Sequence, residues 1–271
     1  MKAWTCLPSV TIIGNSMSIQ LQPQITDLEQ WVSLAQEECA VFEVMDPFFL
    51  SDIGNFEKHK HTTERFRKTG MAASLHGAFI DVNPASGDPK FRELSWQRCR
   101  ESCEIAAALG AGNLVFHSSA FPFLRGAYLE NWAISCASFF ERLVEQYPVR
   151  IYIENAQDLD PQPLRKLMET VRSDRIRVCL DVGHAHYSRT PLCQWFEQLG
   201  EWIEYLHLSD NMGKFDDHLP LGQGNIEWMM VNQCWKDLGK EIPITLETGN
   251  LEATKKSLRF LHKHEYFGVE G

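Results

Sequence analysis

Short apolar runs alternate along the chain with longer segments in which apolar residues recur at helical spacing. Some of the runs, such as residues 113–116 and 151–154, are almost continuously apolar, which is typical of parallel strands covered on both sides. The expected strands are residues 3–13, 39–46, 71–79, 113–119, 149–155, 176–184, 203–210 and 242–247. Eight strand–helix pairs without a break in composition predict an α/β fold, one closed (β/α)8 TIM barrel that forms a single domain over residues 1–271.

Residues typical of helix ends bound several of the expected helices. Thr26 and Glu29 have the spacing of a capping box, which predicts a helix over 26–38. Gly70 is expected to end the second helix, over 54–68, and Gly110 the third, over 89–109. The remaining helices are expected at 127–146, from 161, at 192–199, from 226, and up to about 264.

Acidic and histidine side chains stand at or just beyond the ends of most of the later strands. They are His76, His117, Glu154, Asp181, His184, His207, Asp216, His218 and Glu247. The carboxyl ends of barrel strands share one rim, so these side chains are expected to lie together. Carboxylates and imidazoles are common ligands of divalent metal ions. The pattern therefore predicts a metal site at the C-terminal mouth of the barrel.

Each of these positions also has a simpler interpretation. A glutamate at a strand end, such as Glu154 or Glu247, can lie in solvent. An inward histidine such as His207 can be a hydrogen-bonded core residue, and Asp216 and His218 lie in an expected loop, where such a pair is commonly solvated. The repetition at matching strand ends favours the metal site over these alternatives.

Two weaker signals concern substrate binding. The glycine-containing segment 220–225 precedes a helix and could present backbone N–H groups to an anion. Some aromatic side chains could line a pocket, although aromatic residues pack in cores more often. They are Phe48, Phe49, Phe79, Phe121, Phe123 and Trp228.

Composition and charge narrow the class of protein. The 271 residues are close to the roughly 250 of one such barrel. The formal net charge of −10, without a basic run, argues against nucleic acid as the partner. The eight scattered cysteines contain no CxxC pair, which favours free thiols. No apolar run approaches about 20 residues and no signal-peptide pattern is visible, so we expect a cytoplasmic protein without a membrane partner. The sequence determines no oligomeric state, and a homo-oligomer is one option.

Several segments together resemble a known superfamily. They are HGAFIDVNPASGDP, LVFHSS, IYIEN, CLDVGHAH, YLHLSDN, DDHLPLGQGNI and TLET, and they extend the resemblance over essentially the whole chain. Their order and setting resemble the xylose isomerase-like TIM barrels, which include sugar (phosphate) isomerases and epimerases. The same superfamily contains the endonuclease IV class of apurinic-site nucleases, known as AP endonuclease family 2.

The resemblance implies two different ligand sets. In the epimerases one divalent ion, Mn, Co, Mg or Zn, is held at the positions that correspond here to Glu154, Asp181, His207 and Glu247. In the endonuclease IV branch three zinc ions use these four positions and five more. Those five correspond here to His76, His117, His184, Asp216 and His218.

The two branches imply different chemistry. Proton transfer beside a metal-polarised carbonyl needs an acid and a base, roles that the resemblance gives to Glu154 and Glu247. His76, His184 and Lys214 would then contact the sugar. Phosphodiester hydrolysis needs several ions, and a histidine-rich set suits zinc.

The acidic charge favours the first branch. We therefore predict a divalent-metal-dependent isomerase or epimerase that acts on a small sugar or sugar phosphate in carbohydrate metabolism. The alternatives are a two- or three-zinc phosphoesterase or AP endonuclease, a related lyase or dehydratase, and a barrel that only binds a ligand.

Overall fold

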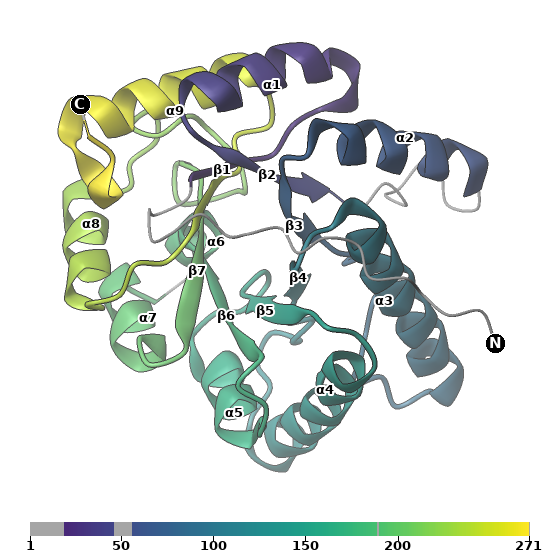
Figure 1. Cartoon of the computed structure of the whole chain (residues 1–271). Coiled ribbons are helices and arrows are strands. Elements are labelled where there is room, and N and C mark those ends of the chain that lie inside the picture. The colour runs from purple at the N-terminus through teal and green to yellow at the C-terminus, as the bar shows by residue number, and fades with distance from the viewer. Residues whose placement is uncertain (1–18, 46–55, 189, 271) are drawn as a thin grey trace.

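The structure is a computed structural model that describes residues 19–45, 56–188 and 190–270. Eight parallel strands pair in chain order and close on themselves as a barrel, because β1 pairs with both β2 and β8 (Figure 1). The strands are β1 Ile19–Leu21, β2 Val41–Met45, β3 Ala72–His76, β4 Asn113–His117, β5 Arg150–Glu154, β6 Ile176–Asp181, β7 Ile203–Leu208 and β8 Ile244–Leu246. The predicted TIM barrel is confirmed.

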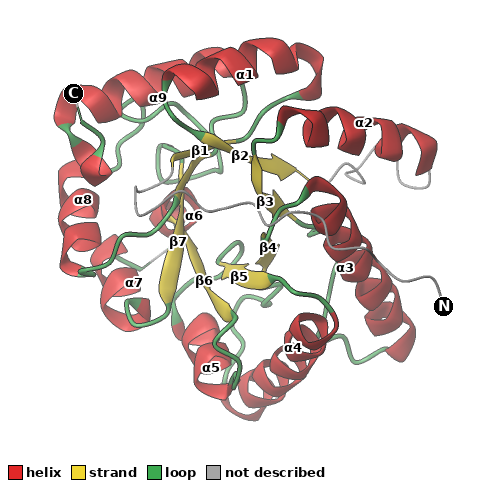
Figure 2. Cartoon of the chain, viewed as in Figure 1, coloured by secondary structure: helices red, strands yellow, loops and turns green. Residues whose placement is uncertain are grey.

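Helices surround the strands as an outer ring, apart from the short helix at 182–187, which directly follows β6 and lies inside the ring (Figure 2). They are α1 Leu28–Glu37, α2 Phe56–Thr69, α3 Pro89–Leu109, α4 Gly126–Gln146, α5 Gln162–Thr170, α6 Val182–Tyr187, α7 Leu192–Leu199, α8 Trp228–Asp237 and α9 Leu251–His264, with short 3-10 helices at η1 Ile25–Asp27 and η2 Tyr266–Gly268. The helix α6 was not expected, because the sequence analysis extended the sixth strand as far as residue 184. No helix in the described ranges is long and apolar enough to cross a membrane.

The beginning of the barrel differs from the prediction. The first barrel strand is β1, where Gln20 is aligned with Val41 on one side and Thr245 on the other. The expected strand at 3–13 lies outside the described residues. The predicted capping box is also wrong: residues 25–27 form a 3-10 turn, α1 begins at Leu28, and the hydroxyl of Thr26 contacts the carboxylate of Asp27 instead.

The third helix has the expected bounds, and its ends explain why. The side chain of Asp88 accepts a hydrogen bond of 2.8 Å from the N–H of Lys90, and Pro89 occupies the first helical turn. Gly110 ends the helix with a φ of +80°, in the left-handed region that a residue without a Cβ adopts readily.

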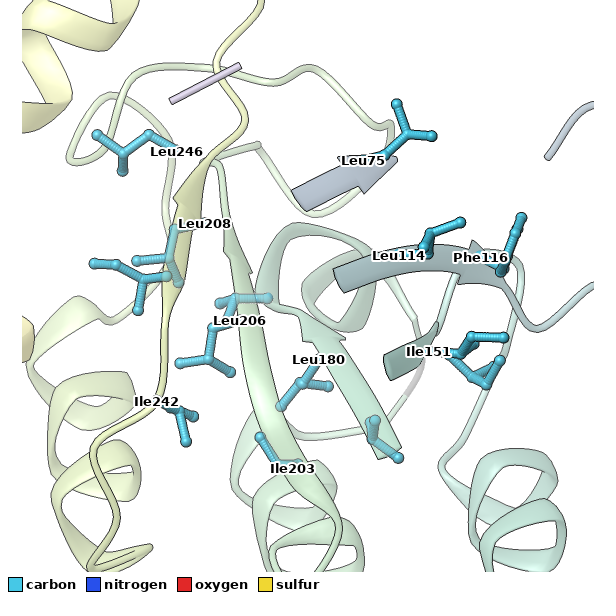
Figure 3. Packing of buried hydrophobic residues seen from close by; sticks show 14 of the residues in the cluster. Leu75, Leu114, Phe116, Ile151, Leu180, Ile203, Leu206, Leu208, Ile242 and Leu246 are labelled. Carbon is cyan, nitrogen blue, oxygen red and sulfur yellow. The ribbon is translucent and has the colours of Figure 1, made fainter. Parts of the chain in front are cut away.

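Apolar side chains fill the layer between the strands and the helices. Leu75, Leu114, Leu206 and Leu246 are buried in this layer, and each contributes roughly 1.5–3 kcal/mol through burial (Figure 3). Successive residues of a strand face opposite sides, so the neighbours of these leucines face the barrel interior. This alternation directs side chains such as His207 inward, at the carboxyl end of the barrel.

Candidate metal centre

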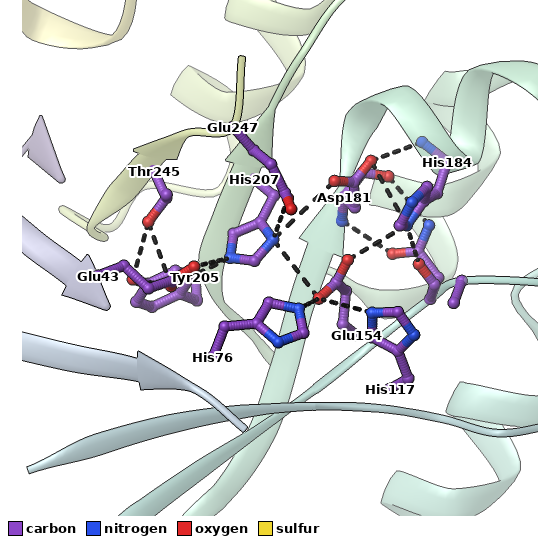
Figure 4. A network of polar contacts seen from close by, with 12 residues as sticks. Glu43, His76, His117, Glu154, Asp181, His184, Tyr205, His207, Thr245 and Glu247 are labelled. Carbon is purple, nitrogen blue, oxygen red and sulfur yellow. Dashed lines mark hydrogen bonds and ion pairs between the residues drawn. The ribbon is translucent and has the colours of Figure 1, made fainter. Parts of the chain in front are cut away.

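The structure brings all nine predicted ligand residues together at the carboxyl end of the barrel. Four strands end on one of them, at His76, His117, Glu154 and Asp181. His207 is the penultimate residue of β7, Glu247 follows β8, and His184 lies in α6. Asp216 and His218 come from the loop between β7 and α8. Much of the resulting network is visible in Figure 4.

The first group of donors consists of Glu154, Asp181, His207 and Glu247. One potential ligand atom from each lies within 4.8 Å of all the others. The Nδ1 atom of His207 is 3.0 Å from a carboxylate oxygen of Glu247, 3.4 Å from one of Glu154 and 3.9 Å from one of Asp181. Three carboxylates therefore converge on one imidazole nitrogen.

A second group shares Glu154 with the first. The Nε2 atoms of His76 and His117 lie 3.2 Å and 3.7 Å from the Oε2 atom of Glu154. The same oxygen also faces His207, so the Glu154 carboxylate stands between two groups of histidines. A carboxylate in this position could bridge two metal ions.

The third group consists of His184, Asp216 and His218. The Nε2 atoms of both histidines face one oxygen of Asp216, at 3.1 Å and 2.9 Å. The Nδ1 atom of His184 lies 2.7 Å from the carbonyl of Asn155, and that of His218 lies 2.9 Å from the carbonyl of Glu247. Because a carbonyl accepts the Nδ1–H of each ring, Nε2 is the nitrogen that faces Asp216. Without an ion this nitrogen donates its proton to the carboxylate, and after losing that proton its lone pair could bind an ion.

His76 and His207 have the same arrangement. The Nδ1 atom of His76 lies 3.1 Å from the carbonyl of Gly77, and its Nε2 atom faces Glu154. The Nε2–H of His207 donates to Glu43 over 3.1 Å, which leaves its Nδ1 atom directed at the carboxylates of the first group. Metal-binding histidines typically donate one ring N–H to an oxygen outside the site and direct the other nitrogen at the ion.

Charges in the cluster are strongly perturbed. Burial raises the pKa of Asp181 to about 7. Burial alone would also raise the pKa of Glu154, but the neighbouring His207 and His117 hold it well below its usual range. The ion pair with Asp216 raises the pKa of His218 to about 10, although burial acts in the opposite direction. The carboxylates of this cluster therefore need protons or cations close by.

Five buried atoms of the first group have no hydrogen-bond partner among the described residues. They are both carboxylate oxygens of Glu154, Oδ2 of Asp181, Nδ1 of His207 and Oε2 of Glu247. Buried polar atoms are normally satisfied, and leaving one without a partner costs roughly 1–3 kcal/mol. These atoms all face one another, and carboxylate oxygen with imidazole nitrogen is a donor set that divalent cations accept. The residues present therefore fit a divalent ion.

Glu43 is a site residue that the sequence analysis missed. It lies in β2, fully buried, and accepts hydrogen bonds from the hydroxyl of Tyr205 at 2.7 Å and the amide of Gln22 at 2.8 Å as well as from His207 (Figure 4). The only signal in the sequence was a charged residue inside an apolar strand. Its place in mid-strand, away from the strand end, removed it from the pattern that identified the other carboxylates.

Asp210 changes the interpretation of the glycine-containing loop. Its carboxylate accepts hydrogen bonds from the N–H groups of Gly222 at 2.9 Å and Ile226 at 3.3 Å, and from the indole of Trp228 at 2.8 Å. A Cβ at Gly224 would overlap the same carboxylate, which explains why this position lacks a side chain. The anion bound by these loop N–H groups is thus an internal one.

A cavity of about 960 Å³ opens beside the cluster. His117, His184 and Asp216 line it, together with Phe79 and Phe121 from the aromatic candidates. Two other candidates do not belong to its lining: Trp228 is buried, and Phe123 is exposed elsewhere. Phe48 and Phe49 lie outside the described residues. Lys214 is exposed on the loop that carries Asp216 and is not among the described residues of the lining.

Comparison with known proteins places this site in a family. A family model described as the xylose isomerase-like TIM barrel matches residues 34–264. The chain belongs to this family. The resemblance inferred from the sequence motifs is therefore confirmed.

Two relatives align with more than two thirds of the chain. Protein MJ1311 of Methanocaldococcus jannaschii is 27% identical over 201 residues, which span 70% of this chain and 69% of that protein. A probable endonuclease 4 of Mycobacterium leprae is 24% identical over 235 residues, which span 78% of this chain and 88% of that protein.

Solved structures include two with high similarity of fold. A D-tagatose 3-epimerase-like protein has a TM-score of 0.75 and 24% identity, and the match covers 92% of this chain and 97% of that one. The protein TTHB071 from Thermus thermophilus, soaked with zinc chloride, has a TM-score of 0.74 and 26% identity, with coverage of 91% and 97%.

Proposed function

We propose that the cluster is a centre for two or three divalent metal ions and that the protein is a metal-dependent hydrolase of a small phosphate ester. The observation that carries this proposal is the convergence of three donor groups, of which two share Glu154. A single ion would need only Glu154, Asp181, His207 and Glu247. It would leave the third group, where two imidazoles face one carboxylate oxygen, without a role in metal binding.

The donor set supports several ions over one. Imidazole nitrogen suits zinc and related transition metals. Of the five histidines in the three donor groups, only His207 belongs to the first group, so a single ion there would use one histidine. Zinc is the ion we expect, and manganese or cobalt would be accepted by the same ligands. Bound divalent ions would polarise the phosphoryl oxygens and lower the pKa of water, which supplies the nucleophile at neutral pH.

The protein's own side chains determine how a substrate reaches the cluster. His117, His184 and Asp216 line the cavity, whereas His76, Asp181 and His207 are buried and do not belong to its lining. A substrate would therefore approach from the side of the second and third groups. Of the described residues in the lining, none is lysine or arginine, so the charge of a phosphate would be balanced by the ions.

A small substrate fits the charge of the molecule better than a polynucleotide does. The formal net charge is −10, and nucleic-acid binding relies on lysine and arginine that displace counterions from phosphates. We therefore propose a small ester and not DNA as the substrate, although one relative is named as a probable endonuclease 4.

The second candidate is the isomerase or epimerase activity expected from the sequence. It is favoured by the position of Glu154 and Glu247, whose carboxylates both face Nδ1 of His207, at 3.4 Å and 3.0 Å. Two carboxylates beside one ion could remove and return a proton next to a carbonyl. In that case His76, His184 and Lys214 would contact a sugar or sugar phosphate. The solved D-tagatose 3-epimerase-like protein shares the fold.

Replacing His218 with alanine separates the two candidates. His186→Ala is a matched control, since His186 lies nearby in α6 but binds Asn225 and is outside the donor groups. With zinc-loaded protein, we expect His218→Ala to reduce hydrolysis of bis(4-nitrophenyl) phosphate by at least roughly a hundredfold, the loss that goes with one of several ions, while His186→Ala retains it. Epimerisation of a ketose panel by the wild type, unaffected by His218→Ala, would instead establish the second candidate.

A further inference from the structure

The outer wall of the cavity is formed by apolar side chains that remain open to solvent. Phe91 is 58% exposed, Leu94 51%, Ile80 43% and Phe121 63%. All four line the same cavity, together with Val82, which is itself buried. Single exposed apolar residues are ordinary, but a contiguous group on a concave surface marks a binding site. We call these five residues the apolar wall.

The apolar wall is continuous with the candidate metal centre. The same cavity is lined by His117, His184 and Asp216. Phe79 joins the two parts, because it lines the cavity and its ring stacks on His117 with a centroid distance of 4.3 Å and an interplanar angle of 27°. A ligand anchored at the centre would therefore have the wall within reach.

The chemistry of the lining limits what can lie against the wall. The charged groups among the described lining residues, apart from the two histidines, are the carboxylates of Asp81 and Asp216. The neutral polar side chains include those of Asn83, Ser119 and Gln157. A second phosphate away from the centre would find no cation among the described lining residues, and a polyhydroxylated chain would lose more hydrogen bonds with water than the wall could replace.

Hydrogen bonds hold the wall in shape. The hydroxyl of Ser119, in the loop after β4, donates to the carbonyl of Val82, in the loop after β3, at 2.7 Å. The N–H of Asn83 donates to the hydroxyl of Ser95 in α3 at 2.9 Å. Asp81 and Ser119 have φ angles of +57° and +52°, a conformation that costs energy for such residues and is common at binding sites. The cavity is therefore formed before a ligand binds.

We propose that the apolar wall binds an aromatic or branched apolar group of the substrate. The substrate would be an amphiphilic small molecule, with an anionic head at the metal centre and an apolar group against Phe91, Leu94 and Phe121. At about 960 Å³ the cavity is at the upper end of the roughly 300–1,000 Å³ of sites for drug-sized ligands. This proposal rests on the proposed function, because the centre supplies the anchor for the head group.

The test compares two phosphonates that differ only in their apolar group. Binding of phenylphosphonate and of methylphosphonate to zinc-loaded protein is measured by isothermal titration calorimetry. We expect phenylphosphonate to bind at least roughly tenfold more tightly, because its ring removes more apolar surface from water. The double variant Phe91→Ser/Leu94→Ser should lose most of this preference, since both residues lie one turn apart on α3.

Tyr128→Ser is the matched control. Tyr128 is the third residue of α4, as Phe91 is the third residue of α3, and it is 81% exposed away from the cavity. The control should keep the full preference for phenylphosphonate. Circular dichroism and zinc content of each variant verify that the fold and the centre are intact.

The outcomes separate this proposal from the proposed function. Equal affinity for the two phosphonates, with zinc bound, overturns the apolar wall and leaves the metal centre standing. A preference that survives in the double variant also overturns it. If the double variant changes the oligomeric state and not the preference, the wall is an interface between copies of the chain. Failure of the wild type to bind zinc overturns the proposed function, and this proposal with it.

Discussion

Replacing Glu43 with glutamine keeps the size of the side chain and removes its charge. In the structure the Glu43 carboxylate accepts the Nε2–H of His207 at 3.1 Å and the hydroxyl of Tyr205 at 2.7 Å. His207 in turn directs Nδ1 at the carboxylates of the first donor group. The substitution therefore acts on the centre through the orientation and basicity of one imidazole, without removing a donor atom.

The expected magnitude follows from these contacts. A hydrogen bond to a charged group contributes roughly 1.5–3 kcal/mol, against about 1 kcal/mol for a neutral pair. Removing a hydrogen-bond partner of a metal-binding histidine typically lowers metal affinity by about 10- to 100-fold. We expect Glu43→Gln to weaken zinc binding by this factor, which corresponds to about 1.4–2.8 kcal/mol.

Competition with a chromophoric zinc chelator measures the change. Thr245→Val is the matched control, because its hydroxyl contacts Glu43 and Tyr205 but not His207. It should leave the affinity within about threefold of the wild type, because no histidine loses a partner. Unchanged affinity in Glu43→Gln would refute the role of Glu43, and an equal loss in Thr245→Val would show that any disturbance of this buried network has the same effect.

Three further predictions concern other parts of the centre and its surroundings. Asp210→Asn places an amide N–H₂ against N–H donors such as the indole of Trp228. It should therefore lower the free energy of unfolding in urea by about 1–3 kcal/mol, and a change below about 0.5 kcal/mol would contradict this. Asp158 is a buried carboxyl whose pKa burial raises from 3.8 to about 6. The folded state therefore favours its protonated form, so the stability of the wild type relative to Asp158→Asn should be greatest below about pH 4. This stability difference should fall by up to about 3 kcal/mol as the pH rises through about 6, when unfolding is measured with chelator present. Unfolding free energies of the wild type and the variant that change in parallel with pH would contradict this prediction. Glu154→Gln should stay folded without metal but lose turnover. Zinc at about 100 times its Kd should stabilise the wild type by about 2.7 kcal/mol and so raise its Tm, and the variant should lose this rise. Unfolding of this variant at ordinary temperature, or an unchanged response to zinc, would count against it.

The barrel could be predicted because strand and helix patterns repeat along the chain. The bounds of α3 follow from Asp88, Pro89 and Gly110, which are local signals. The first strand was misplaced because an apolar run and a short barrel strand look alike in sequence, and β1 is defined by its pairing with β2 and β8. Pairing partners distant in sequence cannot be read from a local pattern.

The candidate site was predictable to the extent that its residues stand at strand ends. Glu154 and Asp181 end their strands, so their position in sequence indicated their place at the rim. Glu43 and Asp210 were missed because their roles depend on tertiary contacts, with His207 and with the loop at Gly222. Of the apolar wall, only Phe121 was among the pocket candidates from the sequence. Phe91 and Leu94 were missed because they lie on a helix, where apolar residues are normally assigned to the core.

The most direct test of the proposed multi-ion centre is the number of metal ions that each chain binds. Protein purified without chelator or affinity tag is analysed by elemental mass spectrometry, together with a sample reconstituted with zinc and passed through a desalting column. We predict two or three divalent ions per chain, of which zinc is the main species. One ion per chain in both samples would contradict the multi-ion centre and favour the isomerase or epimerase interpretation.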